Sequence, residues 1–222
     1  MAGELVANVI ADALVAMPDM ANDASCLRWL NVIHKELCEE FQIVTASADL
    51  TLSTATRDYD LSDTYAAVWS AEYRSSSTAY PIPLERVSVA EYDVENAAWR
   101  NTSQGQPTAF YMYTKNDGTP SIGFDRIPST ATSGGYPTVR IYVSLYTALT
   151  SNGNLPASIR DYMVYVWGLC YKFAQFRHQD EAAQYGKFYE DAKNALGVYM
   201  GRKQRHNPPR QIPMLRAGVA AS

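Results

Sequence analysis

Residues 155–201 read LPASIRDYMVYVWGLCYKFAQFRHQDEAAQYGKFYEDAKNALGVYMG, and the pattern indicates two adjacent amphipathic helices. Pro156 suits a first helical turn, and Ser158 with Asp161 resembles a weak capping box, so we expect the first helix to begin here. Its apolar residues recur at spacings of four and three and predict one buried face: Ile159, Met163, Val166, Cys170 and Phe173.

The second helix of this pair is predicted after a charged turn at residues 177–181. Its periodic positions alternate small and aromatic residues, which favours antiparallel packing on the first helix. We expect the helix to end at Gly201. The positions that predict its buried face are Ala182, Tyr185, Tyr189, Ala192, Leu196 and Tyr199.

The segment from Arg202 to Arg216 carries five positive charges, no acidic residue and three prolines, so it cannot fold by itself. One interpretation is a disordered, solvated terminus. The other is an arm that becomes ordered only against a partner, with apolar anchors and with arginines that bind carboxylates. On the second interpretation the binding residues are Arg202, Lys203, Arg205, Arg210, Ile212, Met214, Leu215 and Arg216.

Charge is distributed unevenly along the 222 residues, whose net charge is −4. Without the five cations of the C-terminal segment, 14 basic residues face 23 acidic ones, which leaves a body of charge −9. A general nucleic-acid-binding surface on the body is therefore not expected. The same asymmetry would let the basic terminus of one copy dock on an acidic neighbour.

The three cysteines, Cys26, Cys38 and Cys170, all fall within predicted helices and form no C-x-x-C pair. An odd number of cysteines without a secretory signal favours reduced, buried thiols and synthesis in the cytoplasm. No apolar run approaches the length of a membrane span. A composition of 47% hydrophobic and 19% charged residues is typical of a soluble globular protein.

The N-terminal region predicts two further amphipathic helices. The first covers residues 4–17 and is closed by Pro18, and the second begins at Asp23 or Ser25. Four apolar helix faces can bury one another in a bundle. The stripes of these two helices are Leu5, Val6, Val9, Ile10, Ala13 and Met17, and then Cys26, Leu30, Ile33, Leu37 and Phe41.

Between residues 43 and 150 the pattern changes from helical to alternating, which predicts short strands at 51–52, 59–61, 68–73, 110–113, 122–124 and 139–146. Asn116, Asp117 and Gly118 are a hairpin signal, and residues 84–94 include a helical turn. The predicted fold is α+β, a four-helix bundle with an inserted small antiparallel β module and an extended C-terminal arm. Its parts are an N-terminal helical hairpin (1–42), the β module (43–150), a C-terminal helical hairpin (151–201) and the arm (202–222).

Motifs for catalysis, phosphate binding or nucleotide binding do not occur, so no catalytic, cofactor-binding or metal-binding residue is predicted. The histidines, His34, His178 and His206, are scattered, and each is interpreted as a solvated polar residue. The acidic cluster of Asp58, Asp60 and Asp63 lacks the glycine and distal glutamate of a calcium loop, which favours a turn flanking a strand. Sixteen tyrosines suit either a half-exposed strand face or a protein interface.

The order of these pieces resembles the head-to-tail adaptor (connector) proteins of tailed bacteriophages, in particular those of short-tailed phages. The chain departs from the family pattern at Ser62 and at residues 125–128, where prolines are usual. The resemblance rests on W-L-N-x-I at 29–33, R-D-Y-D-L at 57–61, Pro83 with Leu84, G-Q-P-T-A-F-Y at 105–111, I-G-F at 122–124, V-R-I-Y-V-S-L-Y at 139–146 and Leu155 with Pro156.

The resemblance implies a non-enzymatic structural protein of the virion neck, synthesised in the bacterial host cytoplasm and needing no cofactor or membrane. It implies a ring, typically a dodecamer, between the portal protein and a tail protein (nozzle or tail hub). Genome DNA would pass through the lumen, and the arm at 202–216 would reach into clefts between portal subunits. The alternative is a glycan- or ligand-binding α+β module of a phage particle that uses the tyrosines and the acidic cluster. That alternative predicts a monomer with a concave aromatic site.

Overall fold

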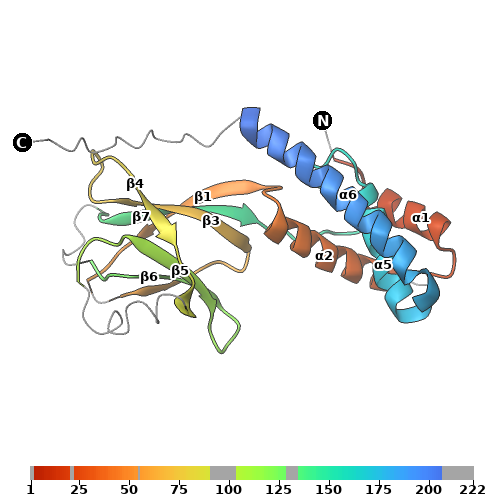
Figure 1. The fold of residues 1–222 in the computed structure, drawn as a ribbon, viewed down its shortest axis with the longest axis horizontal. Helices are drawn as coiled ribbons and strands as arrows, with labels where there is room; N and C mark the ends of the chain where they lie inside the picture. The colour runs from red at the N-terminus through yellow and green to blue at the C-terminus, as the bar shows by residue number, and fades with distance from the viewer. Residues whose placement is uncertain (1–2, 21–22, 55, 91–103, 129–134, 207–222) are drawn as a thin grey trace, which may run out of the picture.

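The computed structural model describes residues 3–20, 23–54, 56–90, 104–128 and 135–206. These residues form an elongated molecule with helices at one end and a curled sheet at the other (Figure 1). Each end has a hydrophobic core of its own. The chain enters the sheet after α2 and returns to the helices after β7.

The helices described are α1 (Val6–Ala16), α2 (Asp23–Glu40), α5 (Met163–Arg177) and α6 (Gln179–His206). The predicted apolar stripes of α1 and α2 are confirmed, because their central residues are buried in the helical core. α1 ends two residues before Pro18, which cannot donate the next backbone hydrogen bond. The fully buried members of the two stripes include Val6, Val9, Ala13, Leu30, Ile33 and Leu37.

α5 lies in the centre of the helical half and contacts α1, α2 and α6. Between Val164 and Ala174 its buried residues lie on several sides of the helix, as expected for a helix surrounded by others, whereas Phe176 near its end is exposed. The predicted start at Pro156 is wrong, because α5 begins only at Met163. The hydroxyl of Ser158 donates to the Ile43 carbonyl at 2.8 Å instead of capping a helix, and Asp161 Oδ1 accepts the Met163 N–H at 3.0 Å.

Seven strands form one sheet in the order β1-β7-β3-β4-β5-β6-β2. All neighbours are antiparallel except β4 and β5, which are parallel. Two irregularities in β3 accompany the curl of the sheet into a half-barrel (Figure 1). The strands are β1 (Thr45–Thr51), β2 (Asp58–Asp60), β3 (Tyr65–Arg74), β4 (Ile82–Arg86), β5 (Ala109–Thr114), β6 (Pro120–Phe124) and β7 (Thr138–Leu145).

The hairpin predicted between β5 and β6 is confirmed, and Gly118 supplies the positive φ of 89° that its turn requires. The alternation predicted for 139–146 is also confirmed, because Val139, Ile141 and Val143 point into the sheet core. β4 was not predicted: residues 82–86 form a strand, and helical structure begins only at Val89.

The predicted architecture, a four-helix bundle with a small antiparallel β module, is therefore wrong. The β half is a seven-stranded mixed sheet with its own core. In the helical half, three helices surround α5, whereas a bundle would enclose a shared core between four equivalent helices. Periodicity reports which face of an element is buried, but not how many strands close around one another.

Candidate functional site

The long helix α6 leads to the predicted portal-binding residues. It has 28 residues, about 42 Å at 1.5 Å per residue, whereas α5 has 15. The two helices pack antiparallel, as predicted (Figure 1). α6 therefore extends past the first turn of α5. Its buried side chains Tyr189, Leu196 and Met200 belong to the helical core.

Polar contacts fix the middle and the far end of α6. Lys193 Nζ lies 2.6 Å from Glu40 Oε2 of α2 and 5.6 Å from the centre of the Tyr189 ring. Burial is the largest single effect on the pKa of Lys193 and would lower it, but the hydrogen bond to Glu40 and the negative charges of the nearby glutamates together raise the pKa. Farther along, the Arg160 guanidinium lies 5.3 Å from the centre of the Tyr199 ring. These contacts hold α6 as far as its sixth turn.

The predicted end of α6 at Gly201 is wrong, because the helix continues to His206. Gly201 does not adopt the positive φ of a helix-terminating glycine. A glycine within a helix costs only about 1 kcal/mol relative to alanine, and the next four residues favour helix.

Helix α6 thus includes three of the eight predicted portal-binding residues in its last two turns: Arg202, Lys203 and Arg205. Cations are favourable at a helix C-terminus, where the macrodipole is negative. The other five lie outside the described residues, so their role stays a prediction: Arg210, Ile212, Met214, Leu215 and Arg216.

Asn31 of α2 ties the helical half to the segment that follows β7. Its Oδ1 accepts the Leu149 N–H at 2.7 Å and the Tyr146 hydroxyl at 3.2 Å. Its Nδ2 donates to the Leu149 carbonyl at 3.1 Å. One amide side chain therefore fixes the chain between the two halves.

His34 was predicted to be solvated, and this is wrong: it is 2% exposed between α2, α5 and the same segment. Its Nδ1 lies 2.8 Å from the hydroxyl of Tyr165, and a further hydrogen bond joins it to the backbone of Thr147. Burial lowers the pKa of His34 to about 4, although the bond to Thr147 acts in the opposite direction. The histidine is therefore neutral near pH 7. In the sequence His34 stands between the apolar Ile33 and the charged Lys35, so the pattern alone does not show whether its side chain is buried.

The acidic cluster makes contacts within the sheet. Asp58 Oδ1 accepts the hydroxyl of Tyr111 at 2.7 Å, so that burial and this carboxylate both raise the pKa of Tyr111. Asp60 is paired with Lys115, which lowers the pKa of Asp60. The sequence favoured a turn that flanks a strand. This is correct for Asp63, whereas Asp58 and Asp60 lie in β2 itself.

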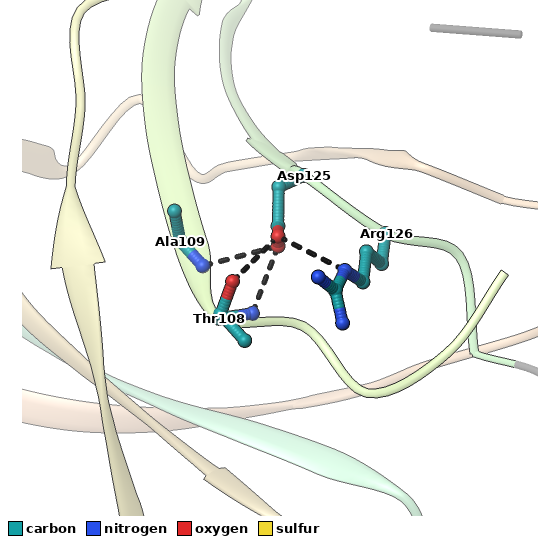
Figure 2. Close-up of polar contacts among 4 residues, drawn as sticks. All are labelled: Thr108, Ala109, Asp125 and Arg126. Atoms are coloured by element: carbon teal, nitrogen blue, oxygen red, sulfur yellow. Dashed lines mark hydrogen bonds and ion pairs between the residues drawn. The ribbon is translucent and has the colours of Figure 1, made fainter. Parts of the chain in front are cut away.

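The side chain of Asp125 joins the end of β6 to the start of β5 (Figure 2). This carboxylate is 1% exposed. Its Oδ1 accepts the N–H groups of Thr108 and Ala109 at 2.8 and 3.0 Å, and its Oδ2 accepts the Thr108 hydroxyl at 2.7 Å. Arg126 Nε lies 3.6 Å from Oδ2. The hydrogen bonds to the buried Asp125 side chain therefore stabilise the sheet where β5 begins beside the end of β6.

A groove of about 510 Å³ lies between α2 and the β5–β6 hairpin. Tyr65, Tyr113 and Tyr146 line it together with Lys35 and Asp63, whereas Asp58 and Asp60 do not. The tyrosines thus gather at one concave surface, but most of the acidic cluster is engaged elsewhere.

Within the described residues, no group of three or more His, Cys, Asp or Glu side chains is arranged to hold a metal ion. Nor does any described helix combine the length and the apolar character that crossing a bilayer requires. The three cysteines are buried and free of disulfides.

Comparison with known proteins gives one family. The model of the family described as SU10 adaptor protein matches residues 2–213, which is nearly the whole chain. No curated protein matches significantly. The family match agrees with the resemblance to phage head-to-tail adaptors and supports a structural role. The chain therefore belongs to the SU10 adaptor protein family.

Proposed function

We propose that this adaptor forms a ring between the portal and the tail of a bacteriophage, with its C-terminal segment docked on the portal. The observation that carries the proposal is the continuation of α6 beyond Gly201. This helix leads from a firmly packed region into a segment with five cations and no acid. Such a segment gains order from a partner that supplies carboxylates and apolar pockets.

The charge of the body supports a channel for DNA. Without the five C-terminal cations the chain has 14 basic and 23 acidic residues. A ring of such copies would surround the lumen with negative charge, which keeps the phosphate backbone from adhering to the wall. DNA would contact the lumen passively, without specific recognition.

Truncation tests the docking role. One variant ends after His206 and another after Gly201, so the arm is removed first and the helical cations second. We expect both to fold, because the described cores contain no residue beyond Met200. Neither should attach to portal-bearing heads that lack the adaptor. Normal attachment of the Gly201 truncation would remove the C-terminal segment from the mechanism.

Charge reversal tests whether the three helical cations bind the portal themselves or only add to the overall positive charge. Arg202, Lys203 and Arg205 are changed together to glutamate, and the exposed Lys187→Glu on the same helix is the control. We expect attachment to heads to fall for the triple variant and to persist for the control. Equal binding by both variants would assign docking to residues 207–222 alone.

The tyrosine-lined groove supports the second candidate, a ligand-binding module of the particle. Aromatic side chains at a concave surface suit a glycan ring. Binding of oligosaccharides by the purified monomer, lost in Tyr113→Ala, would favour this candidate over the adaptor ring.

A further inference from the structure

Two clusters of aromatic side chains lie on opposite faces of the helical half. Phe176 follows Trp167 by nine residues, which at 100° per residue places their side chains on opposite sides of α5. The first cluster, called here the Trp29 cluster, consists of Trp29, Val32 and Phe176. The second, called the Trp167 cluster, consists of Trp167, Tyr185 and Phe188.

The Trp29 cluster exposes apolar surface that the described residues of the subunit leave uncovered. The rings of Trp29 and Phe176 stack with their centres 5.9 Å apart and their planes 2° apart. Phe176 is nevertheless 69% exposed, and Val32, one turn along α2 from Trp29, is 44% exposed. A rigid aromatic pair with an open outer side is typical of an interface anchor.

The Trp167 cluster is a second, shallower aromatic surface. The ring centre of Trp167 lies 5.1 Å from that of Phe188 and 6.4 Å from that of Tyr185. The Tyr185 hydroxyl donates to the Ala16 carbonyl at 3.3 Å, which fixes its ring between α1 and α6. Phe188 keeps 37% of its surface exposed.

The charges beside the two clusters are opposite. Arg28 shares a helix face with Val32, and Arg177 follows Phe176 directly at the end of α5. Glu36, on the same face of α2, is paired with Lys172, so the rim of the Trp29 cluster is positive on balance. Glu181 lies four residues before Tyr185 and Asp191 three residues after Phe188, so the rim of the Trp167 cluster is negative. The two arginines, Glu181 and Asp191 are exposed and, within the described part of the chain, form no ion pair.

We propose that adjacent copies of this chain meet through these two surfaces, with the Trp29 cluster of one copy docked on the Trp167 cluster of the next. The inference rests on the proposed ring and identifies the surfaces through which neighbouring copies in that ring touch. A contact between two different surfaces is heterologous, and it closes into a ring when the rotation between copies is constant. Opposite rims favour this pairing over self-pairing of either surface, which would bring like charges together.

The first test breaks each surface separately in the full-length chain. Phe176→Asp and Phe188→Asp place a charge in one cluster each, and Tyr80→Asp is the control because Tyr80 is 87% exposed before β4. Oligomer mass is measured over a range of protein concentrations. We expect each cluster variant to need a concentration at least about 30-fold higher for half-assembly, with the control unchanged. An unaffected cluster variant whose circular dichroism is native would overturn the proposal.

Mixing the two cluster variants distinguishes a heterologous contact from a symmetric one. Each variant keeps one intact surface, so a mixture should contain dimers with one copy of each variant and no larger species. Rings in the mixture, or dimers of one variant alone, would contradict the pairing.

Charge exchange provides a test that leaves the aromatic side chains intact. Arg28→Glu with Arg177→Glu should weaken assembly, as should Glu181→Lys with Asp191→Lys. All four changes in one chain should restore it, because the rims are again opposite. A quadruple variant that assembles no better than either double variant would refute the assigned contact.

The same series separates this inference from the proposed function. If the wild-type chain assembles only on portal-bearing heads, the variants are compared there by their occupancy of heads. A wild-type chain that assembles neither alone nor on heads contradicts the ring itself, and the contact with it. A wild-type ring that tolerates every cluster and rim variant contradicts only the contact.

Discussion

The buried histidine at the junction predicts a specific loss of stability in acid. His34 has a pKa of about 4 in the folded chain and about 6.5 when unfolded. Between these values the unfolded state binds the extra proton, so the free energy of unfolding falls as the pH falls. Stability from this group is fully present above pH 6.5 and is lost progressively down to pH 4. The difference of about 2.5 pKa units corresponds to about 3 kcal/mol.

The assay is urea unfolding followed by tryptophan fluorescence from pH 7.5 to pH 4, for the wild type and His34→Gln. Other acidic groups titrate in both proteins, so the difference between the two curves isolates His34. We expect the wild type to lose about 3 kcal/mol more than the variant over this interval. His178→Gln, which leaves His34 in place, should follow the wild type. Parallel curves for wild type and His34→Gln would refute the buried, neutral state of this side chain.

Three further substitutions or treatments test the sheet and the helical core. Gly123→Ala should lower the free energy of unfolding by about 3 kcal/mol in urea titrations, because the new methyl group would collide with the Tyr111 ring. Asp125→Ala should cost a similar amount, about 3 kcal/mol in thermal or urea unfolding, because it leaves buried N–H donors unpaired. Burial raises the pKa of Cys38 to about 12 and that of Cys170 to about 11, so neither thiol should react with iodoacetamide at pH 8 until urea unfolds the chain, as mass spectrometry can show.

The elements with a single buried face could be predicted from sequence. α1, α2 and β7 each show a clean period because one side of each packs against a core. The start of α5 could not be located from its apparent stripe, because consecutive residues at its beginning are buried and no period marks the boundary. β4 was concealed by Pro83 within it, since proline removes a donor that a central strand normally uses.

The candidate site was predictable only in its composition. The basic, acid-free terminus is evident from the residues, but Gly201 gave no indication that the helix would continue through Arg202, Lys203 and Arg205. The exposure of Phe176 could not be predicted either, because an apolar residue at helical spacing is expected to be buried and only the packing of the neighbouring helices decides whether it is. Tertiary packing determines both the continuation of α6 beyond Gly201 and the exposure of Phe176.

The packing of α6 on α5 has a mechanical consequence. A pull applied to the C-terminal end of α6 acts along the helix axis, parallel to the seam that contains Tyr189, Leu196 and Met200. The contacts of that seam are then strained simultaneously, in shear, and do not open one after another like a zipper. A subunit built this way would bear tension between a head and a tail without unravelling from its end.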